Sequence, residues 1–318
     1  MIEVTHLTKR YGRTAAVDDL SFTVEKGQIY GFLGPNGAGK STTMNILTGY
    51  IAPGAGEVRI AGHSILDEPE AARKCIGYLP EIPPVYPEMT VAEYLKFAAG
   101  LKKLPSGERA RLIGEAMELT GITEVKNRLI RNLSKGYRQR TGLAQAILGF
   151  PEIIILDEPM VGLDPKQIIE IRELIKQLGE QHTVILSSHI LSEISAICDH
   201  IMIIAHGRLV ASDTPQNLLG MMRGAGAVEL TVRGTETEVR RALEAIGGGI
   251  SFTAHPSEHE ENACEVSVKS DAEGDLREQL FYLFAGAGLP ILRMQNAHAS
   301  LEEVFLELTE EVHYDDDL

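Results

Sequence analysis

Residues 34–41 read Gly34-Pro35-Asn36-Gly37-Ala38-Gly39-Lys40-Ser41 and match the phosphate-binding pattern G-x-x-x-x-G-K-[ST] at every fixed position. The apolar run 28–33 before them predicts a buried strand, and 41–47 after them predicts a helix. The glycines let backbone N–H groups turn toward a polyphosphate, and the helix N-terminus adds partial positive charge. Lys40 would reach the β- and γ-phosphates, and the Ser41 hydroxyl would bind Mg²⁺. A nucleoside-triphosphate site is therefore favoured over a glycine-rich turn without a ligand.

The bulk composition is that of a soluble globular protein, with 44% hydrophobic and 24% charged residues among 318. This length predicts two domains. No apolar run approaches the roughly 20 residues of a membrane-spanning helix, and the N-terminus has no secretion-signal pattern. Because Cys75, Cys198 and Cys264 lie far apart and in no ligand spacing, we expect reduced thiols of a cytosolic protein rather than a disulfide or a metal site.

The net charge of −15 is concentrated in the last third of the chain. From residue 222 onward there are 7 Lys and Arg against 20 Asp and Glu, a balance of −13, which leaves −2 for residues 1–221. Phosphate groups would be repelled by such a segment. We therefore expect no nucleic-acid partner.

The first part of the chain, 1–220, alternates strand-like and helix-like segments and predicts an α/β domain with a mixed sheet. Runs 2–4 and 20–24 alternate with period two, as half-buried antiparallel strands do, whereas 153–156 and 183–186 are continuously apolar, as central parallel strands are.

Small residues at 221–227 mark a boundary to an acidic accessory domain at 221–311. Its strand, helix, strand, strand, helix, strand order predicts a small α+β ferredoxin-like unit. We further expect an amphipathic helix at 300–308 and a disordered tail at 312–318. The six elements are predicted at 228–232, 236–246, 250–253, 264–268, 276–284 and 291–294.

Two carboxylates, Asp157 and Glu158, end the apolar run 153–156. Asp157 can contact Mg²⁺ directly or through water. Glu158 is one residue further along, so it can face the γ-phosphate and polarise the attacking water. Many strands end in acidic loops, but here a phosphate loop lies 117 residues upstream of Asp157, counted from Lys40.

The segment 132–140, Asn-Leu-Ser-Lys-Gly-Tyr-Arg-Gln-Arg, precedes a predicted helix with Ser134 at its N-cap. Alone it indicates only a well-capped helix. Together with the phosphate loop and the Asp-Glu strand, it resembles the signature motif of ATP-binding-cassette (ABC) ATPases, usually written L-S-G-G-Q. Lys135 replaces the first glycine and Tyr137 the glutamine, but Ser134 and Gly136, which would donate to a γ-phosphate, are intact.

This resemblance implies roles for three further residues. Asp164, in Gly-Leu-Asp, resembles the D-loop residue at the dimer interface of the family. His189 resembles the switch histidine, which would hydrogen-bond the γ-phosphate and order Glu158. Tyr11 falls where the family stacks an aromatic ring on adenine. A structural histidine and a strand-edge tyrosine are the alternatives for the last two.

The segment 76–81 resembles the strand that enters the family's Q-loop, but Glu81 stands where glutamine is usual. Glutamate still offers an oxygen to Mg²⁺ or to the lytic water and adds a negative charge. The proline-rich, apolar segment 82–91 corresponds to the region that receives the coupling helix of a membrane partner. By resemblance, a helical subdomain carrying the signature spans about 82–150.

Segments 133–140 and 161–165 and the acidic C-terminal unit resemble ATPase subunits of ABC-2-type exporters. The resemblance implies ATP hydrolysis with Mg²⁺ on the cytoplasmic face of a prokaryotic membrane, ATP held between two copies of the chain, and a separate integral-membrane permease. His255 and His259 lie in an acidic stretch, 255–261, for which a solvated loop is favoured over a metal site.

Two other function classes fit the sequence less well. A soluble ABC ATPase acting in translation would carry two cassettes, and one acting on DNA would insert a long coiled coil where this chain has 117 residues. A P-loop kinase or GTPase-like switch would leave the signature, the D-loop and His189 unexplained. The expected catalytic residues are Glu158 and His189; the expected metal contacts are Ser41, Glu81 and Asp157; the expected nucleotide contacts are Tyr11, Gly34, Pro35, Asn36, Gly37, Ala38, Gly39, Lys40, Ser41, Thr42, Glu81, Ser134, Gly136 and Asp164.

Overall fold

The structure of the protein is a computed structural model that describes residues 1–221, 228–245, 250–257, 259–270, 276–296 and 305–306. These residues fall into two compact units, Met1–Pro215 and Gln216–Leu306, and each unit is considered by itself.

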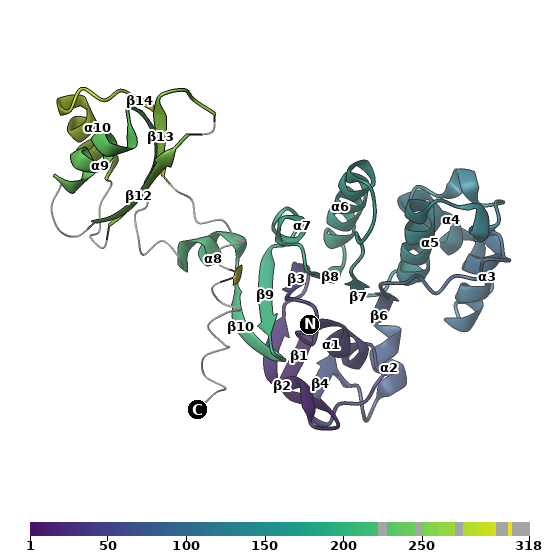
Figure 1. Cartoon of the computed structure of the whole chain (residues 1–318). Coiled ribbons are helices and arrows are strands. Elements are labelled where there is room, and N and C mark those ends of the chain that lie inside the picture. Colours follow the sequence, from purple (N-terminus) through teal and green to yellow (C-terminus); the bar gives the residue numbers. More distant parts are fainter. Residues whose placement is uncertain (222–227, 246–249, 258, 271–275, 297–304, 307–318) are drawn as a thin grey trace. The chain divides into compact units, whose positions relative to one another are not determined.

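A six-stranded sheet in the order β10-β9-β3-β8-β7-β6 forms the centre of the first unit (Figure 1). Its strands run parallel except for β10, which pairs antiparallel with β9. Strands β3, β7 and β8 are buried at every position, so the prediction of central parallel strands is confirmed. The strands are β3 (Ile29–Leu33), β6 (Ile76–Leu79), β7 (Ile153–Asp157), β8 (Thr183–Ser188), β9 (His200–Ala205) and β10 (Arg208–Asp213).

A second, antiparallel sheet has the order β2-β1-β4-β5. Its apolar side chains share one core with β3 and with helix α1 (Lys40–Leu47); for example, the rings of Phe22 and Phe32 lie 5.8 Å apart. Burying this core on α1 and β3 fixes both ends of the phosphate-binding loop. The strands are β1 (Ile2–Tyr11), β2 (Thr14–Val24), β4 (Ala55–Ile60) and β5 (His63–Ser64), and helix α2 (Pro69–Lys74) follows them.

Three helices, α3 (Val91–Leu101), α4 (Arg109–Leu119) and α5 (Lys135–Ile147), pack on one another beyond β6 (Figure 1). Ser134 caps α5 as predicted, because its Oγ accepts a hydrogen bond from the Tyr137 N–H. The remaining elements of this unit are the 3₁₀ turns η1 (Thr123–Val125) and η2 (Ile130–Asn132) and the helices α6 (Pro165–Gly179) and α7 (Leu191–Ser195), with α8 (Pro215–Met221) at the junction to the second unit.

The second unit contains an antiparallel sheet in the order β12-β13-β11-β14. Its two helices pack on the sheet around Val239, Leu280 and Phe284, which are fully buried. This order confirms the predicted ferredoxin-like fold. The expected helix 300–308 (except 305–306) and the tail 312–318 lie outside the described residues. The elements are β11 (Val228–Arg233), α9 (Glu236–Glu244), β12 (Ile250–Pro256), β13 (Ala263–Ser270), α10 (Arg277–Gly286) and β14 (Ile291–Asn296).

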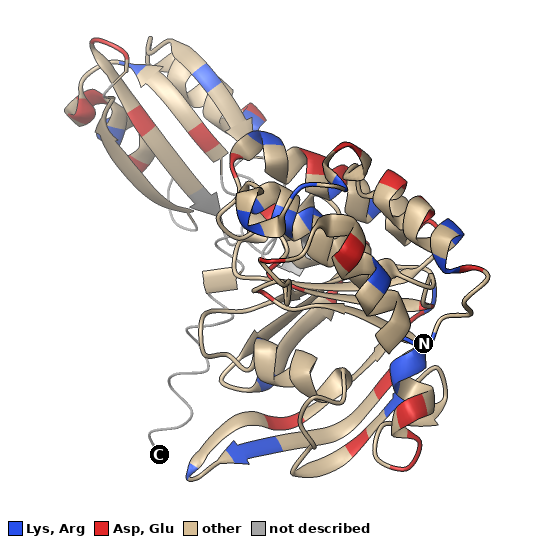
Figure 2. Cartoon of the chain, turned by 90° about the vertical axis from the view of Figure 1, so that its right-hand side faces the viewer, with Lys and Arg blue, Asp and Glu red and all other residues tan. Residues whose placement is uncertain are grey.

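Charged residues and cysteines are distributed over the structure as follows. Basic and acidic residues are interspersed along the helices seen in Figure 2. Cys75, Cys198 and Cys264 are free, as predicted. Within the ranges given above, no helix is both long enough and apolar enough to cross a membrane.

Candidate functional site

The backbone of the phosphate-binding loop lies in close contact with the backbones of β2 and β9. Gly39 has a φ of 102°, and a Cβ atom built on it would lie 2.3 Å from the carbonyl oxygen of Ala16. A Cβ atom on Gly34 would lie 2.4 Å from the carbonyl oxygen of Ile204. Only glycine fits at these two positions, so the fold dictates a loop with bare backbone there, open for a phosphate group to approach its N–H groups.

Lys40 is the buried cation of this loop. Its Nζ donates to the carbonyl oxygens of Gly34 at 2.7 Å and Pro35 at 3.2 Å, and lies 3.9 Å from Oε1 of Glu158. Burial lowers the pKa of the ammonium, and the nearby carboxylates, Glu158 first and then Asp157 and Glu81, oppose this shift. The ammonium is thus held in the loop before any phosphate arrives.

Asp157, at the end of β7, meets oxygen groups from two other elements. The Ser187 hydroxyl of β8 donates to Oδ1 at 2.5 Å, and the Ser41 side chain of α1 acts on the pKa of the carboxyl. Burial raises the pKa of the Asp157 carboxyl. The Ser187 hydrogen bond and, least of all, the Ser41 side chain lower that pKa, whereas the charges of Glu158 and Glu81 raise it further. Hydroxyl and carboxylate oxygens are the donors Mg²⁺ takes beside phosphates, so this set fits that ion.

No group of three or more His, Cys, Asp or Glu that would enclose a metal occurs among the residues that the structure describes. Such a cage is not needed here, since Mg²⁺ at phosphate sites binds one or two carboxylates together with phosphate oxygens and water.

Glu158 follows Asp157 in a left-handed backbone conformation, with a φ of 48°. Its N–H donates to the Ser187 Oγ at 3.0 Å, and its carboxylate lies 3.0 and 3.1 Å from Nδ1 of His189. The Glu158 residue is only 8% exposed, whereas the His189 side chain is 39% exposed. A buried carboxylate beside a more accessible imidazole is suited to orient a water molecule at the mouth of the loop.

Glu81 and Tyr11 are two exposed residues of the predicted site. Glu81 is exposed just after β6, and its charge acts on both Lys40 and Asp157. Tyr11 is 54% exposed at the end of β1, and its ring centre lies 5.7 Å from Nζ of Lys9. Its exposed face is free for stacking, so that role stays a prediction.

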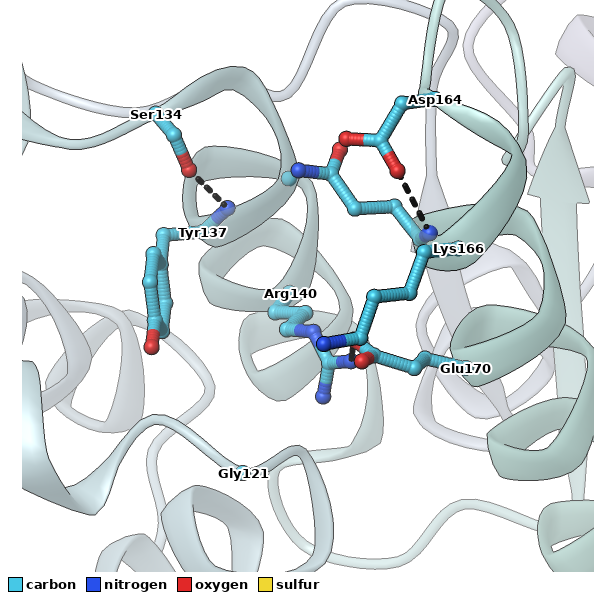
Figure 3. A pocket seen from close by; sticks show the side chains of 9 residues that line it. Gly121, Ser134, Tyr137, Arg140, Asp164, Lys166 and Glu170 are labelled. Carbon is cyan, nitrogen blue, oxygen red and sulfur yellow. Dashed lines mark hydrogen bonds and ion pairs between the residues drawn. The ribbon is translucent and has the colours of Figure 1, made fainter.

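The remaining predicted contacts lie in a separate pocket of about 460 Å³ between the N-terminal ends of α5 and α6 (Figure 3). Asp164 caps α6 by accepting from the Gln167 N–H at 2.9 Å, and Arg140 and Glu170 form an ion pair of 2.5 Å beside it. The pocket contains no residue of the phosphate-binding loop. Its lining residues are Gly121, Ser134, Gly136, Tyr137, Arg140, Asp164, Lys166, Gln167 and Glu170.

The hydroxyls at the end of β8 and the Glu193 carboxylate are not among the residues predicted for the site. Ser188 Oγ accepts from the Ile190 N–H and donates to the buried Glu193 carboxylate, both at 3.0 Å, so the turn that carries His189 is fixed on both sides. Burial raises the pKa of Glu193. The sequence feature that could have indicated these residues is the pair Ser187-Ser188 at the carboxyl end of a largely apolar strand.

The strand, glycine loop and helix, with a buried lysine and two carboxylates facing it, define a P-loop nucleoside triphosphatase. A family model described as "ABC transporter" matches residues 17–161. The chain is 33% identical to the linearmycin resistance ATP-binding protein LnrL of Bacillus subtilis, over 97% of this chain and 98% of that protein. It is 34% identical to the bacitracin transport ATP-binding protein BcrA of Bacillus licheniformis, over 97% of both.

Among solved structures, the dimeric ATP-binding cassette MJ0796 bound to ADP and Pi matches with a TM-score of 0.62 and 25% identity, over 67% of this chain and 98% of that one. The chain belongs to the ABC transporter family and is the ATP-binding, ATP-hydrolysing subunit of a transporter. Because the LnrL and BcrA alignments span nearly the whole chain, they include the second unit, in agreement with the ABC-2-type exporter resemblance.

Proposed function

We propose that this chain hydrolyses ATP with Mg²⁺ to power export through a separate integral-membrane permease. The observation that carries the proposal is the convergence of Lys40, Asp157 and Glu158 at the carboxyl ends of β3 and β7. The names of LnrL and BcrA, a resistance and a transport protein, favour the same function.

In this proposal each residue acts on a defined part of the reaction. Lys40 neutralises the β- and γ-phosphates, and Ser41 and Asp157, with Glu81 nearby, hold Mg²⁺, which supplies charge neutralisation of the phosphates when bound. Glu158 accepts a proton from the attacking water, and His189 orients the Glu158 carboxylate. The 3.0 Å contact between His189 Nδ1 and Glu158 Oε2 supports that pairing.

We infer that two copies of the chain enclose each nucleotide. Ser134, Gly136 and Asp164 line a pocket that excludes the chain's own loop, so a second copy is the simplest source of the γ-phosphate contacts expected from Ser134 and Gly136. The dimeric state of the MJ0796 cassette supports this arrangement. A homodimer is the proposed form.

The permease contact is proposed at an apolar patch on and before α3, formed by Tyr86, Phe97 and Leu101. These residues are 51%, 39% and 67% exposed, and the Tyr86 and Phe97 rings meet edge to face at 5.5 Å. Large exposed apolar side chains in one cluster are typical of protein interfaces. The patch begins at Tyr86, five residues after Glu81 in the sequence.

A membrane permease would hold the chain peripherally on the cytoplasmic face, and no nucleic-acid partner is proposed. The proposed domain limits are 1–220 for the ATPase domain, about 82–150 for its helical subdomain and 221–311 for the accessory domain. The relatives named above give no support to a role in translation or DNA maintenance.

The test is ATP hydrolysis by the purified full chain, with Mg²⁺ and with EDTA, combined with fractionation of native membranes. We expect hydrolysis that requires Mg²⁺ and co-sedimentation with membranes. Phe97→Ser should release the chain from membranes while the purified chain still hydrolyses ATP. Leu66→Ser is the matched control, because Leu66 is also exposed, at 57%, but lies outside the patch.

Hydrolysis that depends on added ribosomes or DNA, with no membrane association, would support the soluble alternative instead. Equal membrane binding by Phe97→Ser and the parent chain would remove the apolar patch from the proposal.

A further inference from the structure

The Ser187 hydroxyl joins the two carboxylate residues at the end of β7. It donates to Oδ1 of Asp157 at 2.5 Å and accepts from the N–H of Glu158 at 3.0 Å. Ser187 is fully buried, at 0% exposure. A single hydroxyl therefore donates a hydrogen bond to Asp157 and accepts one from the backbone of Glu158.

Two features at the end of β7 indicate that this hydrogen-bonded bridge orients the two carboxylates. First, Glu158 adopts a left-handed backbone conformation, with a φ of 48°, which is unfavourable for residues with a side chain. Strained conformations of this kind persist only where surrounding contacts fix them. The Glu158 N–H bond to Ser187 is such a contact, and it turns the Glu158 side chain away from the direction that a regular strand would give it.

Second, Asp157 is 4% exposed. A carboxylate with so little access to water takes its orientation from protein donors. The hydroxyl seen to donate to it is that of Ser187, which is not itself an expected Mg²⁺ contact and therefore stays available to the carboxylate when a metal is bound.

We propose that Ser187 is a positioning residue for ATP hydrolysis, whose hydroxyl sets both the Asp157 carboxylate toward the metal and the Glu158 side chain toward water. The inference rests on the roles proposed above for those two residues. Partners that orient a metal-binding carboxylate typically contribute 10- to 100-fold to metal affinity or activity.

The adjacent serine does not share this function. Ser188 points to Glu193 and to the turn that carries His189. Because side chains alternate along a strand, Ser187 serves the β7 carboxylates and Ser188 serves the histidine turn.

The test compares Ser187→Ala, Ser187→Thr and a matched control, Thr183→Val, in the full chain. Thr183 lies on the same strand, is 1% exposed and also accepts from a backbone N–H, that of Gly27 at 3.0 Å, but it is remote from the carboxylates. Both Ser187→Ala and Thr183→Val therefore remove a buried hydroxyl from β8. Thermal unfolding establishes that the variants are folded, and Ser187→Cys, with a weaker hydrogen-bonding group, replaces Ser187→Ala if that variant does not fold.

Two quantities are measured: the affinity for a fluorescent ATP analogue in EDTA and in saturating Mg²⁺, and kcat. We expect Ser187→Ala to bind the analogue normally in EDTA, to lose most of the affinity gained with Mg²⁺, and to show a kcat lower by roughly 10- to 100-fold. Ser187→Thr should restore both quantities to near the parent values, and Thr183→Val should change neither.

A Ser187→Ala variant that matches Thr183→Val in Mg²⁺ response and kcat would overturn the inference. Failure of the proposed function would look different: Glu158→Gln would then keep normal turnover, whatever Ser187→Ala does.

Discussion

Nδ1 of His189 lies 3.0 Å from Oε2 and 3.1 Å from Oε1 of Glu158, so the imidazole faces both oxygens of the carboxylate. The donating hydrogen on Nδ1 leaves Nε2 on the far side of the ring. The His189 side chain is 39% exposed and Glu158 is buried, so under the proposed mechanism the histidine would link the buried carboxylate to the bound nucleotide.

Glu158→Gln is expected to bind ATP but to lose turnover by about 100-fold or more, because glutamine is isosteric with glutamate and accepts no proton. ATP should therefore accumulate on the protein and hold it as a dimer. Phosphate release and size-exclusion chromatography with ATP measure the two effects. Near-normal hydrolysis would identify another residue as the base, with Glu81 the first to examine.

Lys40→Ala is expected to fail earlier, at nucleotide binding. The ammonium lies inside the loop, 2.7 Å from the Gly34 carbonyl, where few waters can replace it against phosphate charge. Binding of labelled ATP separates this variant from Glu158→Gln. Parent-like affinity in Lys40→Ala would contradict the assignment of the loop.

Ser134→Arg is expected to leave ATP binding intact and to block ATP-driven dimerisation, since Ser134 lines the pocket apart from the chain's own loop. Loss of the N-cap should lower the free energy of unfolding by only about 1 kcal/mol. The measurement is size-exclusion chromatography of Glu158→Gln with and without Ser134→Arg in ATP. Dimers of the double variant would argue against nucleotide enclosed by two copies.

Gly39→Ala is expected to destabilise the nucleotide-free protein more than Gly37→Ala. Both glycines have positive φ, 102° and 85°, but an added Cβ atom meets the Ala16 carbonyl oxygen at 2.3 Å only at Gly39, and Gly37 has open space around it. Gly37→Ala should cost about 1–2 kcal/mol for its backbone conformation, and Gly39→Ala more. Urea unfolding of the two variants measures this; equal losses would show that the loop is not pressed against β2.

Lys102 is expected to make the free energy of unfolding depend on pH in the alkaline range. Its Nζ donates to the carbonyl oxygens of Ala146 at 2.8 Å and Leu148 at 3.0 Å at the end of α5, and burial lowers its pKa to about 8. The unfolded chain keeps a pKa of about 10.4. Between these values the unfolded state binds the extra proton, so the free energy of unfolding rises with pH, by at most about 1.4 kcal/mol per pH unit.

Below pH 8 the destabilisation by Lys102 should be fully present, and toward pH 10 it should disappear. The measurement is the difference in free energy of unfolding between the parent and Lys102→Met, from urea curves at pH 7.5, 8.5 and 9.5. A difference that stays constant over this range would show that Lys102 titrates normally in the folded protein.

Much of this architecture could be predicted because its signals are local. The loop 34–41 has a fixed pattern, buried parallel strands such as β7 are continuously apolar, and Ser134 caps α5 through a residue three positions away. The ferredoxin-like fold of the accessory unit could be predicted from the order of its four strands and two helices, and the strand pairing agrees with it.

The contacts that organise the site were not predictable in the same way, because they join residues distant in sequence. Ser187 meets Asp157 across 30 positions, and only the pairing of β7 with β8 brings them together. The left-handed conformation of Glu158 has no sequence signal of its own, since glutamate rarely adopts it. The Lys102 contact with the end of α5 likewise depends on how α3 packs against α5.

The separation of the phosphate-binding loop from the Ser134 pocket within one chain has a genetic consequence under the proposed arrangement of two copies. A copy altered at Glu158 would still carry a sound signature helix and would still pair with unaltered copies. Its expression beside the normal gene would draw normal subunits into complexes that bind ATP without releasing it. Such an allele should be dominant, whereas an allele that abolishes folding should be recessive.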